Sequence, residues 1–594
     1  DNGRQPRTRS LRAPALAMSE EDARVERYLL EHRIEAVLAD AVLDAVLCGA
    51  PSPLRHIAAY LTRITDGLSP AVEMVPSAPR RLLRTATWNI AAINNNPFEF
   101  WITHDDPEYQ ALMTGVQSFI SAPGEQDVSV SEVFPAHRFE ALRSLMSAQG
   151  WSGLDQLDAF WRDDLSARPI VSGFMKDKSL GDKRLASMPD RVTNAIDTAD
   201  GGRVFRPSVI SCYAGDLSSQ QVWWEAWTTF MFRTPLSLPA KAVGGPPVQA
   251  VPAALLGPIQ RSKYPAVTEE EEAISIPLQT LCAAVFDAIL VHIVNTVSPG
   301  GAWQSLKTSM LASLYDNKTA RTLAILAAGR HDVAFVQEAA SAFPAAAQAA
   351  SSPLHASHFV VAPSDCSKSD QNSLVLLSRV AFDPGSVREL SDRALALCPT
   401  ANAPVAPGDL LAVSVEAVAA GPADFSAPGE APTKYLLGSF HGDTNGLASL
   451  PVLRAMHALA QQMPDHTLVF GLDANTHLHA KPGKVLGVAE FADAFTSLGY
   501  ASCWGATPGA SHYTTFCART FLQPQLQKAC SMEERATKGD RNPKDFVLFP
   551  SPQWELEAVA RDNTGEGRFV EEMVLPTLAF PSDHALLAAT IALQ

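Results

Sequence analysis

The chain has 594 residues, more than one hydrophobic core normally serves, so we expect two or three domains. Apolar residues make up 46% of the chain and charged residues 19%, which is typical of globular rather than disordered proteins. The formal net charge of −16 disfavours non-specific binding to DNA or RNA, because such binding needs a basic surface, but it is compatible with a local basic groove.

Cysteine usage argues against a zinc-binding protein, and hydropathy argues against a membrane-spanning protein. The eight cysteines show no Cys-x-x-Cys pair and no regular spacing, which predicts reduced thiols in an intracellular protein and no structural zinc site. No apolar run reaches about 18 residues, the length that crosses a bilayer, so we expect no membrane span.

The first 66 residues divide into a tail and a helical module. Residues 1–17 carry four arginines and little apolar content, which predicts a disordered tail, with a transit peptide as the alternative. Residues 18–66 predict two helices, the first with an acidic first turn after Ser19 and the second opening at Pro51-Ser52-Pro53. Apolar residues recur in them at steps of three and four, among them Ile34, Leu38, Val42, Leu54, Ile57 and Leu61.

Two short helices cannot bury this apolar surface by themselves, so the module needs a partner. The stretch from Tyr28 to Leu61 resembles the dimerisation and docking module of protein kinase A type II regulatory subunits. The resemblance implies a homodimeric four-helix bundle over residues 18–64, whose groove binds an amphipathic helix of an anchoring partner. It also implies an intracellular setting such as the cytoplasm, a cilium or a flagellum. The alternative is an ordinary hairpin packed on the main domain.

The main domain is predicted to begin with one strand and then to be interrupted. Residues 67–83 are rich in proline and predict a linker. Residues 84–103 contain a short β-rich run that ends near Asn89. Residues 104–316 predict a mainly helical insertion, which should cover the sheet edge because it leaves directly after this strand. Its clearest helix begins at the capping box Thr268-Glu269-Glu270-Glu271.

Three features of the insertion have two interpretations each. His104-Asp105-Asp106 either offers metal ligands or begins a helix. The stretch from Lys176 to Arg184 either contacts phosphate or is a solvated charged segment. Three tryptophans, at positions 223, 224 and 227, either stack on bases or belong to the core. The structural interpretation is the expected one in each case.

Residues 317–594 complete the main domain with several short β-rich runs. Each run delivers a polar residue at or just beyond one end, which gathers polar groups along one sheet edge. The residues delivered are Glu338, His441, Asp473, Asn475, Asp545, Asp583 and His584. Residues 399–433 are rich in alanine, proline and glycine and predict a surface excursion.

These segments, in this order, resemble the signature segments of the endonuclease/exonuclease/phosphatase superfamily, the deoxyribonuclease I-like fold. The resemblance implies an α/β protein built as a four-layer α/β/β/α sandwich, with two packed mixed β-sheets flanked by helices. The helical insertion and the N-terminal helical hairpin would be additions to that sandwich.

The resemblance also implies roles for individual residues. A Mg²⁺ site, with Mn²⁺ as the alternative ion, is expected at Asn89, Glu338 and Asp583. Catalytic roles are expected for His441, Asp473, Asn475, Asp545 and His584: Asp473 would orient or deprotonate water, Asp545 and His584 would form a carboxylate-imidazole pair, and His441 and Asn475 would donate to phosphate. Polar loops are expected to contact substrate through Asn445, Arg519 and Lys528.

The expected activity is metal-dependent hydrolysis of a phosphodiester or phosphomonoester, by a nuclease or a phosphatase. The substrate would be nucleic acid, a phosphorylated small molecule or a lipid head group, and the acidic total charge favours something more selective than duplex DNA. The alternative is a non-catalytic scaffold that uses the fold as a binding surface in a larger assembly, for instance in a cilium.

Overall fold

The computed structural model describes residues 81–91, 95–185, 192–240, 245–366, 371–399 and 403–594, together with Leu54, Ile57, Ala58 and Leu61. The chain divides into two units, Asp1–Arg80 and Arg81–Gln594, and the fold described below is that of the second. In the first unit, Ile34, Leu38 and Val42 lie outside the described residues. Leu54, Ile57 and Leu61 are helical, and Leu54 is 81% exposed. Dimerisation through residues 18–64 therefore stays a prediction.

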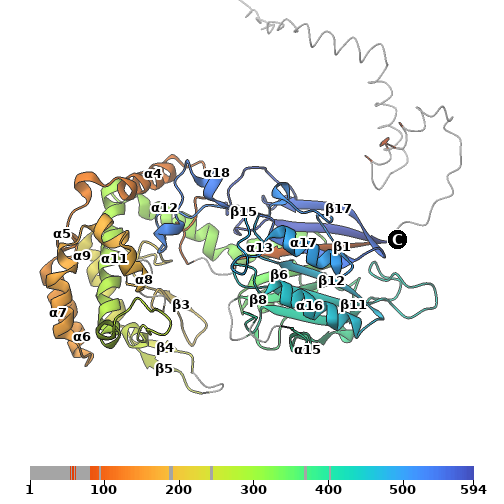
Figure 1. Ribbon diagram of the computed structural model, residues 1–594, viewed down its shortest axis with the longest axis horizontal. Coiled ribbons are helices and arrows are strands. Elements are labelled where there is room, and N and C mark those ends of the chain that lie inside the picture. The colour runs from red at the N-terminus through yellow and green to blue at the C-terminus, as the bar shows by residue number, and fades with distance from the viewer. Residues whose placement is uncertain are drawn as a thin grey trace, which may run out of the picture. The chain divides into compact units, whose positions relative to one another are not determined.

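Two six-stranded mixed sheets form the centre of the second unit (Figure 1). The strands of the first sheet, in spatial order, are β17 (Trp554–Asp562), β18 (Leu586–Leu593), β1 (Leu82–Asn89), β6 (Val333–Ala339), β8 (Asn372–Ser378) and β7 (His358–Val361). Those of the second are β13 (Tyr500–Ser502), β16 (Asp545–Pro550), β12 (His466–Asp473), β11 (Lys434–His441), β10 (Leu410–Glu416) and β9 (Arg388–Glu389). Each sheet has one parallel pair, β1 with β6 and β11 with β12.

Alternation of side chains along the strands builds the layers. In β6, Val333 and Phe335 face the second sheet and join one core, while Ala334 and Val336 face outward into another. The outer core of the first sheet is covered by α13 (Lys318–Ala328) and α14 (Phe343–Gln348). The second sheet is covered by α15 (Ser391–Ala396), α16 (Ser449–Gln461) and α17 (Val488–Ser497). The predicted four-layer α/β/β/α sandwich is confirmed.

The insertion gathers its helices around one central helix, α11 (Ser275–Val297), which contacts most of the others (Figure 1). The surrounding helices are α4 (Pro107–Ser121), α5 (Val130–Val133), α6 (Ala136–Ala148), α7 (Leu154–Asp163), α8 (Lys178–Asp182), α9 (Gln220–Phe232), α10 (Glu269–Ala273) and α12 (Ala302–Leu311). Two small hairpins accompany them, β2 (Ala195–Asp197) with β3 (Arg203–Phe205) and β4 (Leu236–Leu238) with β5 (Val248–Ala250). Among the described residues, α11 is the one helix long and apolar enough to cross a bilayer, but 78% of its apolar window is buried inside the protein, as in a core helix.

The structure decides between the alternatives for the insertion. Asp106 caps α4 by accepting hydrogen bonds from the backbone N–H groups of Glu108 and Tyr109, so it begins a helix. The tryptophans at positions 223, 224 and 227 are buried in the core of the insertion. The charged stretch from Lys176 to Arg184 contains the short helix α8, and Lys183, which follows the helix, pairs with Glu271 at 2.6 Å.

One expectation was wrong: residues 399–433 are not only a surface excursion. They contain β10, a seven-residue strand with five buried residues that pairs with β11 on one side and with β9 on the other. The apolar run Leu410-Leu411-Ala412-Val413 is flanked on both sides by alanine, proline and glycine, and this local composition obscured it.

A segment between two short strands joins the insertion to the sandwich. The strands are β14 (Thr515–Cys517) and β15 (Asp540–Asn542), and we call residues 518–539 between them the rim loop; it includes the helix α18 (Arg535–Lys538). Ala518, Leu522 and Cys530 of the rim loop belong to the hydrophobic core of the insertion. Trp101 donates two hydrogen bonds to the rim loop, from its backbone N–H to the carbonyl of Ala518 at 2.8 Å and from its indole to that of Cys530 at 3.1 Å. The core of the insertion, together with Trp101 just before it, therefore holds the rim loop in place.

Candidate active site

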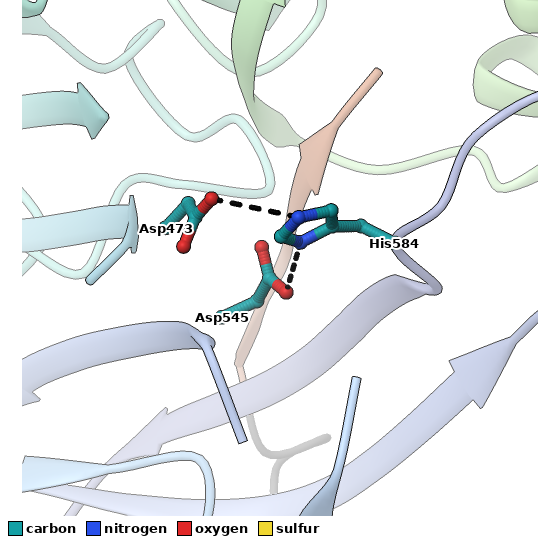
Figure 2. A group of neighbouring side chains, drawn as sticks. All are labelled: Asp473, Asp545 and His584. Atoms are coloured by element: carbon teal, nitrogen blue, oxygen red, sulfur yellow. Dashed lines mark hydrogen bonds and ion pairs between the residues drawn. The ribbon is translucent and has the colours of Figure 1, made fainter. Parts of the chain in front are cut away.

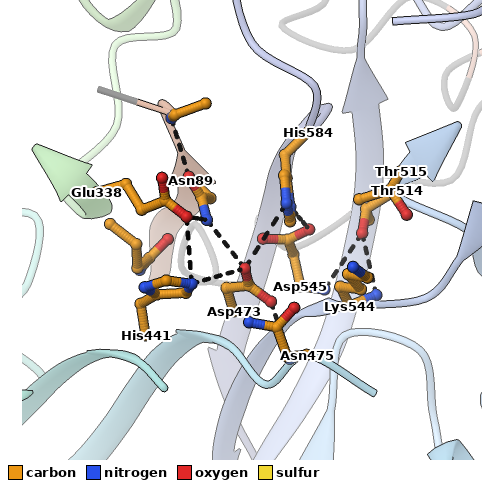
Figure 3. Close-up of polar contacts among 12 residues, drawn as sticks. Asn89, Glu338, His441, Asp473, Asn475, Thr514, Thr515, Lys544, Asp545 and His584 are labelled. Carbon is orange, nitrogen blue, oxygen red and sulfur yellow. Dashed lines mark hydrogen bonds and ion pairs between the residues drawn. The ribbon is translucent and has the colours of Figure 1, made fainter. Parts of the chain in front are cut away.

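Three strands of the second sheet bring polar residues into one row. Because β11 runs parallel to β12 and β16 runs antiparallel to β12, His441 pairs with Asp473 and Asp473 pairs with Asp545. The two aspartates are fully buried at the ends of strands that are otherwise apolar. Figure 3 shows the three side chains side by side at the edge of the sheet.

The first sheet contributes Asn89, Glu338 and His584 to the same edge (Figure 3). Asn89 is the last residue of β1. Glu338 lies where the register of β6 against β8 shifts, and its φ is +51°, a bulge conformation that re-aims a side chain. His584 is fixed through its backbone, whose carbonyl accepts from the Trp88 indole at 2.9 Å and whose N–H donates to Ser582 Oγ at 3.0 Å.

The amide of Asn89 links the two sheets. Its Nδ2 donates to Glu338 Oε1 at 3.1 Å and to Asp473 Oδ2 at 2.9 Å. Its Oδ1 accepts from the backbone N–H of Ala91 at 2.9 Å, which fixes the orientation of the amide. Asn89 therefore orients two carboxylates from opposite sheets, and its own oxygen faces the backbone.

Asp473, Asp545 and His584 form a buried triad (Figure 2) whose candidate ligand atoms lie within 4.8 Å of one another. His584 Nδ1 lies 2.9 Å from Asp545 Oδ2, and its Nε2 lies 3.6 Å from Asp473 Oδ2. Burial alone lowers the pKa of His584, but the charges of Asp545 and Asp473 raise it to about 10. The imidazole is thus held as a cation between two carboxylates, one of which is hydrogen-bonded to it.

Asp473 is the carboxylate on which most contacts converge. In addition to the contacts with Asn89 and His584, Asp473 Oδ2 lies 3.7 Å from His441 Nε2. Asp473 Oδ1 accepts a hydrogen bond from the backbone N–H of Asn475 at 2.9 Å. Burial would raise the pKa of Asp473, but the nearby charges of His584 and His441 lower it below its usual value. Asp473 is therefore an ionised carboxylate at neutral pH.

Besides the buried triad, Glu338 and Asp583 could hold a metal ion. Both line the same cavity and both are partly exposed to it. Glu338 is held by the Asn89 amide and by His441 Nε2, 3.2 Å from Oε1. Burial lowers the pKa of Lys318 to about 8, and the negative charges of Asp583 and Glu338 oppose that shift. Two carboxylates open to water, one of them oriented by Asn89, fit Mg²⁺, which takes few protein ligands and keeps several waters.

A cavity of about 750 Å³ opens in front of these groups. Arg519 and Lys528 of the rim loop line it, as expected for substrate contacts. Asn445 is exposed and is not among the lining residues, although its neighbours Asp443 and Thr444 are. The site residues that line it are Glu338, His441, Asp473, Asn475, Asp583 and His584, with Asn89 and Asp545 behind them.

Three charged residues near the site have no recognisable signal in the sequence. Lys544 lines the cavity from the position before Asp545. Lys318, at the start of α13, donates from Nζ to the carbonyl of Ala91. Asp409 lines the cavity beside His441, and burial raises its pKa to about 6. No local pattern marks them, because each looks like an ordinary solvated residue in its segment.

The fold and the site together define a four-layer α/β sandwich with a polar cavity where its two sheets meet. A family model described as a domain of unknown function (DUF8234) matches residues 127–308, which lie within the insertion. No curated protein matches the chain.

Several solved structures resemble the chain over about half its length. D. rerio TDP2 complexed with a single-strand DNA product has 16% identity and a TM-score of 0.30, covering 47% of this chain and 92% of that one. The human Nocturnin catalytic domain with bound sulfate has 13% identity and a TM-score of 0.29, covering 48% and 90%. An endonuclease/exonuclease/phosphatase family protein from Bacteroides thetaiotaomicron has 11% identity and a TM-score of 0.30, covering 50% and 94%. At these identities and TM-scores the matches assign no activity to the chain.

Proposed function

We propose that the protein is a metal-dependent hydrolase of phosphate esters, acting on a phosphodiester or a phosphomonoester. The observation that carries the proposal is the Asn89 amide, which donates to Glu338 at 3.1 Å and to Asp473 at 2.9 Å and so sets two carboxylates from different sheets side by side. Hydrolysis of a phosphate ester needs charge neutralisation at the phosphoryl oxygens and an oriented water, and these carboxylates suit the two tasks.

In this proposal Glu338 and Asp583 hold Mg²⁺, with Mn²⁺ as the alternative ion. When bound, the ion would neutralise charge on the phosphoryl oxygens. Neither carboxylate is buried, and both line the cavity where a phosphate would enter. Asn89 keeps Glu338 oriented, so the ligand does not have to reorganise when the substrate binds.

The remaining residues act on the water and the phosphoryl group. Asp473, ionised and fixed by two donors, accepts a proton from the attacking water. His584, held by Asp545 as a cation, donates toward charge that develops on the phosphoryl oxygens. His441 lies 3.2 Å from Glu338 and lines the cavity, where it donates to the phosphoryl or leaving oxygen together with Asn475.

The test is phosphate or nucleotide release from a panel of esters, with Mg²⁺, with Mn²⁺ and with EDTA. The panel holds single-stranded and duplex nucleic acid, nucleotides, sugar phosphates and phosphoinositide head groups. Glu338→Gln and His584→Ala should each lower kcat at least a hundredfold, whereas Asn445→Ala, an exposed change outside the cavity, should leave it unchanged. Equal rates for all four proteins would favour the non-catalytic scaffold.

We also propose that residues 18–64 form a homodimer that binds an amphipathic anchoring helix, inside the cell and in a cilium or flagellum. The support is the apolar spacing of the module, with Leu54 helical and 81% exposed. Light scattering on the full chain and on a chain without residues 1–66 tests it. The same number of chains per particle in both proteins would contradict dimerisation. A tagged full chain distributed evenly through the cell would contradict anchoring.

A further inference from the structure

Four lysine and arginine side chains line the cavity of the site: Arg519, Lys528, Lys538 and Lys544. Lys544 alone among them is buried, with 5% of its side chain exposed. A long charged side chain on the surface loses much conformational freedom when it binds a ligand, whereas a buried one is already ordered. Lys544 is therefore the pre-organised cation of this cavity.

The backbone around Lys544 is fixed on both sides. Its N–H donates to Thr514 Oγ1 at 3.1 Å, and its carbonyl accepts from Ala474 N–H at 2.8 Å. The same Thr514 oxygen accepts from Asp545 N–H at 3.2 Å, so one hydroxyl positions both neighbours. In Figure 3, Glu338 lies to one side of Asp473 and Lys544 to the other. The cation therefore stands on the other side of Asp473 from Glu338.

The ammonium group of Lys544 retains hydrogen-bonding capacity. It has three N–H donors, and in the described part of the chain its one hydrogen bond is to Asp540 Oδ2, at 2.7 Å. Asp540 is itself fixed by the Asn542 amide at 2.6 Å and is partly exposed to the cavity. A purely structural ion pair would not need to border the substrate cavity, whereas both members of this pair line it.

The rest of the cavity does not suit a polyanion. Of the three less buried lysines and arginines, Arg519 pairs with Glu99 and Lys538 pairs with Glu534, so two of them are partnered by acids. The carboxylates that line the cavity outnumber its four cations; they are Glu338, Asp409, Asp443, Asp473, Asp540 and Asp583. A nucleic-acid track needs a stripe of unneutralised lysine and arginine, whereas in the described part of the chain these walls combine four lysine and arginine side chains with six carboxylates. The arrangement fits one compact ligand with anionic groups at two points.

We propose that Lys544 forms an anion-binding subsite and that the substrate is a compact phosphoester carrying a second anionic group, a phosphate or a carboxylate. The inference rests on the proposed phosphoesterase function for the position of the first phosphate. The second group accepts a charge-assisted hydrogen bond from Lys544 Nζ while Asp540 keeps that ammonium in place. Lys544 thus determines which ester binds, and the residues around Asp473 cleave it.

Non-hydrolysable probes test the subsite without turnover. Alkane bisphosphonates with spacers of three to six carbons are compared with alkylphosphonates of the same length, by calorimetry on the Mg²⁺-loaded full chain. The parent should bind at least one bisphosphonate about tenfold or more tightly than its matched monophosphonate. Lys544→Met should reduce the ratio of bisphosphonate affinity to monophosphonate affinity to within about twofold of one. It should leave the monophosphonate affinity itself nearly unchanged. Lys528→Met, which removes an exposed cation from the same cavity, should preserve the ratio.

Several results would overturn the subsite: a ratio near one in the parent, a ratio that survives Lys544→Met, or equal losses in Lys544→Met and Lys528→Met. If Lys544→Met fails to fold, the charge-balanced Lys544→Met/Asp540→Asn variant replaces it, with the same expected ratio. Glu338→Gln should weaken both kinds of probe. If Lys544→Met lowers the affinity ratio but no ester of the panel is hydrolysed, the subsite is supported and the hydrolase function is refuted. If an ester is hydrolysed but Lys544→Met leaves the affinity ratio unchanged, the hydrolase function is supported and the subsite is refuted.

Discussion

Replacing the Asn89 amide by a carboxylate should destabilise the fold in a pH-dependent way. In the parent, Asn89 Nδ2 lies 3.1 Å from Glu338 Oε1 and 2.9 Å from Asp473 Oδ2. Asn89→Asp places a third acid between two others and removes both hydrogen bonds. Asn89→Leu removes the same hydrogen bonds without adding a charge, so the difference between the two variants isolates the electrostatic effect.

The size of the effect follows from the distances. At about 3 Å and an effective dielectric of about 20, each pair of carboxylates repels by roughly 5 kcal/mol, so the folded cluster keeps one proton instead. Holding that proton costs about 1.4 kcal/mol per pH unit above an ordinary pKa near 3.9, or about 1.5 kcal/mol at pH 5 and about 5 kcal/mol at pH 7.5. Because the folded state binds the extra proton, stability falls as the pH rises.

Urea denaturation in EDTA at pH 5 and pH 7.5 measures this difference. Asn89→Asp should be less stable than Asn89→Leu by about 1.5 kcal/mol at the lower pH and by about 5 kcal/mol at the higher one. Mg²⁺ should recover more of the lost stability in Asn89→Asp than in Asn89→Leu, because a carboxylate adds an oxygen ligand. Equal stabilities of the two variants at pH 7.5 would refute the arrangement of Glu338 and Asp473 around Asn89.

Three further predictions concern other parts of the structure. Asp545→Asn removes the charge from the 2.9 Å hydrogen bond to His584 and should lower kcat about 10- to 100-fold with little change in KM; kinetics within twofold of the parent would contradict its role. Burial lowers the pKa of Lys307 to about 7, so the unfolded chain binds a proton that the fold lacks between pH 7 and pH 10; stability should rise across that window by up to about 1.4 kcal/mol per unit, and urea titrations of Lys307→Met should show a flatter profile. Asp106→Ala removes the cap of α4 and should cost about 1 kcal/mol in urea denaturation, while the exposed change Asp105→Ala should cost nothing measurable.

The positions of the site residues were predictable because each ends or begins an apolar run. An acid or imidazole at the end of a buried strand cannot face the core, so Glu338, His441 and Asp473 had to gather at a sheet edge. The sequence did not reveal the register, which depends on pairing between distant strands. The contact of the Asn89 amide with both sheets follows from the packing of the layers, and no local pattern contains it.

The missed residues share a physical cause. Lys544 and Lys318 are buried. Lysine is so rarely buried that, from the sequence, each is expected to be a solvated surface residue. The buried ammonium of Lys544 pairs with Asp540, four residues earlier on β15, and that of Lys318 donates to the carbonyl of Ala91. Neither contact is apparent from the residues around each lysine in the sequence. Strand β10 was missed for a compositional reason, since alanine, proline and glycine surround it.

The rim loop has a practical consequence for dissecting this protein. Ala518, Leu522 and Cys530 are buried against the helices of the insertion, so a sandwich cut free of residues 104–316 would keep Trp101 but expose a hydrophobic patch and lose the packing that supports one cavity wall. Such a fragment would be prone to aggregate and would have a misshapen binding site. The two halves must be purified and assayed as one piece, and inactivity of the isolated sandwich would say nothing about its chemistry.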